Sequence, residues 1–353
     1  MKQTLVSSVA ATVASGRCDS RCTSRAISAA WPFALAVLLA GACAHENDEV
    51  DDPAYDDIVS GGGKADGGAD GHVDLYRTDE NVIAVSRSVA AVLDKEQLYS
   101  SIPGETALLP FSFAEDTLAQ VMNRQGHPLC ESEPFSKQPV RARGTAFLIA
   151  SNMVVTAGHV ATRKSCEDMR FVFDYAYHVD PATRPTGLRE ITTRPTENIY
   201  SCRQVILDPN GHDIALVLLD RPVTGRYSFP LVSSQVLPPV GEPVAMLGHP
   251  SGLPMKFAAP GRVIHRDDPF GASTEDRDAG FFTNVGADRG GAGSPVMSRR
   301  GVEGVLVGDG NDWAWNEAQG CYETKVCQGD GSNCAGEYVV HARHVIDMLR
   351  SLE

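Results

Sequence analysis

The stretch FLIASNMVVTAGHVAT, Phe147–Thr162, is the most informative segment of this 353-residue chain. Two apolar runs, 144–150 and 153–156, flank Ser151-Asn152, a polar pair typical of a tight turn between antiparallel strands. The second run leads directly into Thr156-Ala157-Gly158-His159. We therefore predict a β-hairpin whose second strand ends at a histidine.

Two later segments add a carboxylate and a glycine-rich loop. The segment GHDIALVLLDRPV, Gly211–Val223, places Asp213 immediately before an apolar strand. The segment TNVGADRGGAGSPVMS, Thr283–Ser298, enters a strand through Ser294-Pro295-Val296. An aspartate at a strand start is usually a turn residue, and a histidine among apolar residues is usually structural. The histidine, the aspartate and the glycine-rich loop occur in this order along the chain.

The chain from Val73 onward is predicted to be mainly short strands. Apolar runs bounded by proline and glycine recur at 170–177, 202–207, 214–219, 243–247, 280–285, 294–297 and 302–307. Helical spacing occurs at 338–352 and, ambiguously because of its valines, near 78–98. Many strands with a C-terminal helix predict antiparallel β-barrels.

Taken together, these segments resemble the trypsin-like (chymotrypsin-fold) serine peptidases, and in particular the bacterial glutamyl-endopeptidase-like secreted members. The resemblance covers residues 134–353 and implies an all-β fold of two antiparallel six-stranded β-barrels with a C-terminal helix. We expect the first barrel at about 73–221 and the second at about 222–336, with the cleft between them. Residues 73–133 match less well and are expected to form an N-terminal extension and the start of the first barrel.

The resemblance implies roles for particular residues. His159 corresponds to the general base and Asp213 to the acid that orients it. The backbone N–H groups of Gly290 and Ala292 correspond to the oxyanion donors. Gly286, Asp288 and Gly308 correspond to positions around the substrate, and a glycine at 286 does not support selectivity for basic side chains.

The nucleophile position departs from the family, because Ala292 stands where the family has serine. A methyl group cannot attack a carbonyl. Ser294 is the alternative nucleophile, but two residues of extended chain separate the positions by about 6–7 Å. The enzyme assignment is therefore open, and the chain is a serine endopeptidase only by family.

Three further positions invite an interpretation. His249, in the segment 248–252, is interpreted as structural rather than catalytic. Val160 and Gly144 replace both cysteines of a disulfide that is common in the family. The dipeptide Ile58-Val59 resembles the mature start of trypsin-like enzymes, but position 291 lacks the acid that such a start requires. We therefore assign Ile58-Val59 to a tether.

The N-terminal residues have the features of an export signal and a spacer. Residues 1–42 combine a basic start with an uncharged run that ends in small side chains, which is typical of a signal peptide. Cys43 ends LLAGAC and resembles a lipoprotein cysteine; plain secretion is the alternative. Residues 43–72 are acidic and rich in glycine, which predicts a flexible tether.

Export bears on the cysteines and on the expected partners. Six cysteines remain beyond Cys43, enough for three disulfides, one of them expected among Cys321, Cys327 and Cys334. The net charge of −14 makes nucleic acid a poor partner. We expect a monomer of the cell envelope or a secreted monomer, with no cofactor and no metal.

Three function classes stay open: a peptidase homologue that binds peptides or proteins in its cleft, an active endopeptidase (through Ser294, or with Ala292 an engineered change), and a structural surface lipoprotein.

Overall fold

The computed structural model describes residues 55, 58–59, 71–99, 107–108, 116–178, 198–266, 279–285, 291–308, 313–325 and 336–353. The predicted signal peptide and Cys43 lie outside these residues. The chain divides into two units, Met1–Asp48 and Glu49–Glu353, and everything described here belongs to the second. No helix among the described residues is long and apolar enough to cross a membrane.

Six strands of the first half close into an antiparallel barrel in the order β2-β5-β6-β9-β8-β7. Their bounds are β2 Val89–Asp94, β5 Gly144–Ala150, β6 Met153–Ala157, β7 Met169–Phe173, β8 Ile199–Leu207 and β9 Ile214–Leu219. The predicted hairpin is β5–β6, with Leu148 opposite Val154. All six residues of β9 are buried, which explains why its sequence is continuously apolar.

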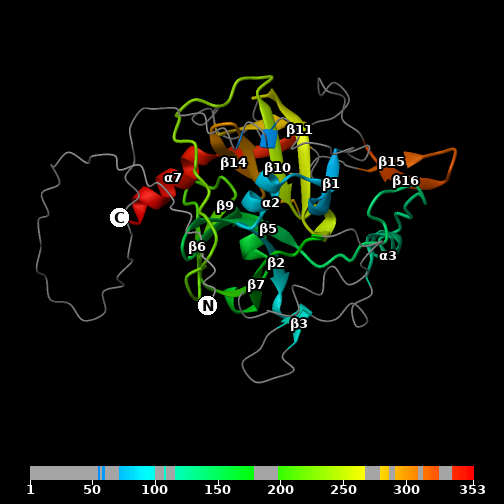
Figure 1. The fold of residues 1–353 in the computed structure, drawn as a ribbon, viewed down its shortest axis with the longest axis horizontal. Helices are drawn as coiled ribbons and strands as arrows, with labels where there is room; N and C mark the ends of the chain where they lie inside the picture. The colour runs from blue at the N-terminus through cyan, green and yellow to red at the C-terminus, as the bar shows by residue number, and fades with distance from the viewer. Residues whose placement is uncertain are drawn as a thin grey trace, which may run out of the picture. The chain divides into compact units, whose positions relative to one another are not determined.

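The second half contributes six strands to a sheet that also closes on itself. The strands are β10 Pro243–Gly248, β11 Lys256–His265, β12 Gly280–Thr283, β13 Pro295–Ser298, β14 Gly301–Gly308 and β17 Glu337–His341. Pairing of β11 with β12 as well as β10 completes a six-stranded barrel. The predicted all-β fold of two six-stranded barrels is thus confirmed, and Figure 1 shows the two sets of strands with helix α7, Ala342–Ser351, after β17.

The N-terminal part differs from the expected boundaries. Strand β1, His72–Asp74, was expected in the first barrel, but it pairs with β11 of the second. The segment expected as one helix near 78–98 contains helix α2, Glu80–Ser86, and then strand β2. Asp79 begins α2 by accepting the N–H of Val82 at 2.9 Å, and the β-branched valines after Ser86 favour the strand.

Three residues of the predicted tether are buried in the core. Ile58 is fully buried, and Tyr55 and Val59 are only 6% exposed. They belong to the same hydrophobic cluster as Val82 and Val89. The tether assignment therefore does not hold at these residues. Burial of their apolar side chains is favourable, although the acidic, glycine-rich sequence around them predicts a flexible segment.

Smaller elements extend the second barrel. Strands β15, Trp313–Asn316, and β16, Cys321–Thr324, form a hairpin near helix α3, Leu118–Arg124 (Figure 1). The disulfide Cys130–Cys321 joins this hairpin to the segment after α3. A second disulfide, Cys166–Cys202, ties the start of β7 to β8. Cys327 and Cys334 lie outside the described residues. The remaining described elements are β3, Leu98–Tyr99, β4, Ala107–Leu108, and α4, Gly158–Thr162.

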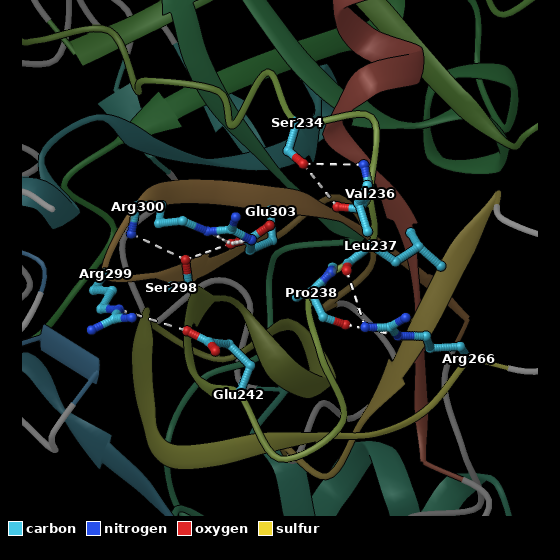
Figure 2. A network of polar contacts seen from close by, with 10 residues as sticks. All are labelled: Ser234, Val236, Leu237, Pro238, Glu242, Arg266, Ser298, Arg299, Arg300 and Glu303. Carbon is cyan, nitrogen blue, oxygen red and sulfur yellow. Dashed lines mark hydrogen bonds and ion pairs between the residues drawn. The ribbon is translucent and has the colours of Figure 1, made fainter. Parts of the chain in front are cut away.

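A polar network supports the turn that joins β13 to β14 (Figure 2). The carboxylate of Glu303, fully buried, accepts hydrogen bonds from the Ser298 hydroxyl at 2.5 Å and from Arg300 Nε at 3.0 Å. Burial raises the pKa of Glu303, while Ser298 and Arg300 act in the opposite direction. Nearby, Arg266 donates to the carbonyls of Leu237 and Pro238. The network fixes the far end of β13, whose near end carries the loop at 291–294.

Candidate active site

His159 and Asp213 form a hydrogen-bonded pair at the surface of the first barrel. The ring Nδ1 of His159 lies 2.7 Å from Asp213 Oδ2, and the backbone N–H of His159 donates to Oδ1 at 2.7 Å. Both carboxylate oxygens therefore hold the same histidine, one through its ring and one through its backbone. The side chains are 50% and 40% exposed, so solvent reaches the pair.

The local folding of both residues explains this arrangement. His159 lies in the single turn of α4, directly after β6. Asp213 ends the loop between β8 and β9 with φ +58°, a left-handed conformation that costs a non-glycine residue about 1–2 kcal/mol. Its carbonyl accepts the N–H of Gly158 at 2.6 Å. A Cβ at Gly158 would lie 2.9 Å from Asp213 Oδ1, so only glycine permits this approach.

The loop at 291–294 is held between the two barrels. The N–H of Thr145, on β5, donates to the carbonyl of Ala292 at 2.8 Å, and Gly293 N–H donates to Leu306, on β14, at 2.7 Å. The Thr156 hydroxyl in turn donates to the Thr145 carbonyl at 2.6 Å. Gly293 has φ +92°, and a Cβ there would meet that carbonyl oxygen at 1.9 Å. These contacts fix the backbone at position 292 through main-chain hydrogen bonds, which do not require a serine side chain.

Ser294 lies in a different environment from the one a nucleophile needs. Its side chain is fully buried at the start of β13. A Cβ added at Gly248 would come within 2.0 Å of its Oγ, which places the hydroxyl against the backbone of β10. A substrate carbonyl cannot reach a hydroxyl enclosed in this way. Ala292, by contrast, is partly exposed and packs against the core of the first barrel.

His249 occupies a buried structural position. It is fully buried, its ring stacks on Tyr175 with centroids 5.6 Å apart, and its Nδ1 lies 3.1 Å from the carbonyl oxygen of Leu253. Burial lowers the pKa of His249 to about 3, opposed by the Leu253 contact and assisted by the charge of Lys256. A neutral, enclosed imidazole agrees with the structural interpretation.

Two glycine positions named from the sequence lie in close contacts. A Cβ at Gly144 would be 2.5 Å from Val160 Cγ1, so these two residues face each other, as the family resemblance implied. Gly308 ends β14 opposite Tyr338, with 3.1 Å between its added Cβ and that of Tyr338. Gly286, Asp288 and Gly290 lie outside the described residues, so the substrate positions and one oxyanion donor stay predictions.

The sequence analysis did not single out two groups that shape the site. Thr145 holds Ala292, and no local pattern identifies it, because its partner is 147 residues away. Asp208 and His212 organise the loop that ends at Asp213. The segment Asp208-Pro209-Asn210-Gly211 is a recognisable turn sequence, so this second group was accessible to sequence reasoning.

The chemistry open to this arrangement is limited by position 292. An oriented imidazole can accept a proton from a hydroxyl and return it to a leaving group. At position 292 the side chain is a methyl group, which has no proton to give. Among the described residues, no cluster of three histidine, cysteine, aspartate or glutamate side chains could hold a metal ion.

Comparison with known proteins gives a family model and distant structural similarities. A family model described as a trypsin-like peptidase domain matches residues 144–308, which include His159, Asp213 and Ala292. A search of curated proteins gave no match.

Solved structures similar to this chain include the Rv3671c protease of M. tuberculosis in its active form, 16% identical with a TM-score of 0.39 over 76% of this chain and 82% of that one. Its inactive form is 16% identical with a TM-score of 0.39, over 76% and 91% of the two chains. An inactive serine-to-alanine mutant of Rv3671c from M. tuberculosis H37Rv is 15% identical with a TM-score of 0.39, over 77% and 90%. Similarity at this level transfers neither an activity nor a substrate.

Proposed function

We propose that this chain, whose residues 144–308 match a trypsin-like peptidase domain, is a disarmed serine-endopeptidase homologue that binds peptides or proteins in the cleft between its barrels. The observation that carries the proposal is the pair His159–Asp213, held by two contacts of 2.7 Å, in a chain whose side chain at position 292 is methyl. The base, its orienting acid and the loop backbone are present, while the nucleophile is not.

The buried position of Ser294 supports this proposal over an active peptidase. Recruitment of Ser294 would require its hydroxyl to leave the enclosed space against Gly248 and to cross about 6–7 Å of extended backbone. The hydrogen bonds of Gly293 with Leu306 and of Leu306 with Ser294 would have to break in the process. A purely structural lipoprotein, the third class, has no need of a carboxylate that binds one histidine twice.

Peptide binding by the unmodified chain tests the proposed function. The protein is incubated with a peptide mixture from a digested, denatured protein, and backbone hydrogen exchange is compared with and without the mixture. We expect slower exchange at Val307 and Gly308, the part-buried end of β14, because a bound extended segment covers this backbone. The N–H groups of Gly293 and Leu306 are already hydrogen-bonded within the protein and should change little. Absence of slowed exchange, or slowing confined to other surfaces, contradicts a ligand in the cleft.

We further propose that the chain is exported and anchored through a lipid on Cys43. The sequence LLAGAC and the acidic segment after it support anchoring with a spacer. Cells that express the full chain are grown with a labelled fatty acid, and the purified protein is assayed for the label. The parent should carry label, whereas Cys43→Ser should not; equal label in both, or none in the parent, excludes this anchor.

A further inference from the structure

A second imidazole–carboxylate pair lies immediately beside the first. His212 Nδ1 is 2.5 Å from Asp208 Oδ2, and the backbone N–H of His212 donates to the same oxygen at 3.1 Å. The side chains are 13% and 2% exposed, so this pair is buried while His159–Asp213 is open to solvent. His212 directly precedes Asp213 in the chain, which links the two pairs through one peptide bond.

The buried pair closes the loop that carries Asp213. The backbone N–H of Asp208 donates to Ile214 at 3.1 Å and the N–H of Gly211 donates to Asp208 at 3.3 Å. The carboxylate of Asp208 also accepts from Asn210 Nδ2 at 3.4 Å. Asp208 thus binds several residues of the loop between β8 and β9 through its backbone and its carboxylate. Asp213, in its left-handed conformation, ends this loop.

The C-terminal helix covers the pair from the other side. His344, on α7, is 7% exposed, and its ring lies over that of His212 with centroids 3.8 Å apart and planes inclined by 32°. Arg343 Nε donates to His344 Nε2 at 3.2 Å, which restricts the His344 ring. Stacking of the two rings restrains the His212 side chain. The His212 backbone, which leads into Asp213, is held by its N–H donation to Asp208.

We propose that Asp208, His212 and His344 are positioning residues for Asp213, through which helix α7 keeps the Asp213 carboxylate directed at His159. This inference rests on the proposed function, because it takes His159–Asp213 to be part of the functional site. Its mechanism is geometric. Asp208 fixes the backbone of His212, His344 fixes its ring, and the peptide bond from His212 carries this restraint to Asp213. The N–H groups of Gly158 and His159 hold Asp213 from the other side.

The spectroscopic test uses the chain as it exists, with Ala292. The ring proton that joins His159 Nδ1 to Asp213 should give a downfield NMR resonance, assigned by its loss in His159→Gln. Asp208→Ala should abolish this resonance while the protein stays folded by circular dichroism. Asp220→Ala is the matched control, because Asp220 also accepts a backbone N–H, from Ser201 at 3.0 Å, at the opposite end of β9. Retention of the resonance in folded Asp208→Ala would overturn the proposal.

A second pair of variants decides the matter if Asp208→Ala does not fold. His344→Ala removes the stacked ring, whereas His344→Phe keeps a flat ring without its nitrogens. We expect the resonance to weaken severalfold in His344→Ala and to return in His344→Phe. Equal spectra of the two variants and the parent would overturn the role of His344, because a merely structural helix residue would not move this signal.

A reactivity measurement separates this inference from the proposed function. In the A292S background, a fluorophosphonate probe should label position 292, and Asp208→Ala should slow labelling at least tenfold while Asp220→Ala leaves it unchanged. Labelling that is indifferent to Asp208 refutes the positioning role alone. Absence of labelling in A292S, with a His159 resonance that still depends on Asp208, refutes the proposed function and leaves the positioning role standing.

Discussion

Replacement of His249 by asparagine should reduce the loss of stability that this protein suffers in mild acid. Burial lowers the pKa of His249 to about 3, from an ordinary value of 6.5. The unfolded chain therefore binds a proton as the pH falls below 6.5, while the folded chain does not. Stability contributed by this group is complete above pH 6.5 and is lost as the pH falls towards 3.

The size of the effect follows from the pH interval. Between pH 6.5 and pH 5, an interval of about 1.5 pH units, the histidine becomes protonated in the unfolded chain only. This difference lowers the free energy of unfolding by about 2 kcal/mol. His341 is also fully buried, and burial first, with the charges of Arg343, His344 and Arg300, lowers its pKa to about 3. The two histidines together should remove about 4 kcal/mol between pH 7 and pH 5.

Urea unfolding at pH 7 and pH 5, followed by circular dichroism, measures this difference. In His249→Asn the amide nitrogen can still donate to the Leu253 carbonyl, but the side chain no longer titrates. The variant should lose about 2 kcal/mol less than the parent over the interval. The exposed His127, changed to asparagine, is the control and should behave as the parent. Equal losses in parent and His249→Asn would refute the claim that His249 is buried and neutral.

Three further substitutions test the packing around the site by the same urea unfolding assay at pH 7. Ile58→Ala should lower the free energy of unfolding by about 3 kcal/mol, because Ile58 is fully buried; a change near zero would show that it is not part of the core. Gly293→Ala should cost about 2 kcal/mol or more, since its Cβ would lie 1.9 Å from the Thr145 carbonyl oxygen, and tolerance of alanine would contradict that approach. Lys256→Met should cost about 3–5 kcal/mol by leaving Asp74, bound to Lys256 Nζ at 2.7 Å, buried without its cation; a neutral effect would refute the ion pair.

Local patterns were sufficient to predict most of the strands, and the family resemblance added the two barrels and the His159–Asp213 pair. The β5–β6 hairpin follows from two apolar runs around Ser151-Asn152, and the buried β9 follows from its uninterrupted apolar sequence. Each signal lies within about ten residues of chain, which is the range over which strand periodicity and turn residues act. The pairing of His159 with Asp213 was predicted from the family likeness, and the contacts of 2.7 Å agree with it.

Contacts between distant segments could not be predicted in this way. The three-residue strand β1 has no pattern that favours β11 over the first barrel. The disulfide Cys130–Cys321 spans 191 residues, and no local spacing indicates that Cys321 pairs with Cys130. A bridge between Cys327 and Cys334 stays a prediction. Burial of Ile58 depends on its packing in a core cluster with residues such as Val82 and Val89, which are distant in sequence. Its own sequence neighbours are acidic and glycine-rich and give no sign of this packing.

Covalent labelling of A292S tests the central claim, that the site is complete except for its nucleophile. The parent and A292S are treated with a fluorophosphonate, and the modified residue is identified by mass spectrometry. The account predicts no label on the parent, label at position 292 in A292S, and a rate at least about 10³-fold lower when Asp213→Asn is added. Label at Ser294 in the parent, or no label in folded A292S, would contradict it.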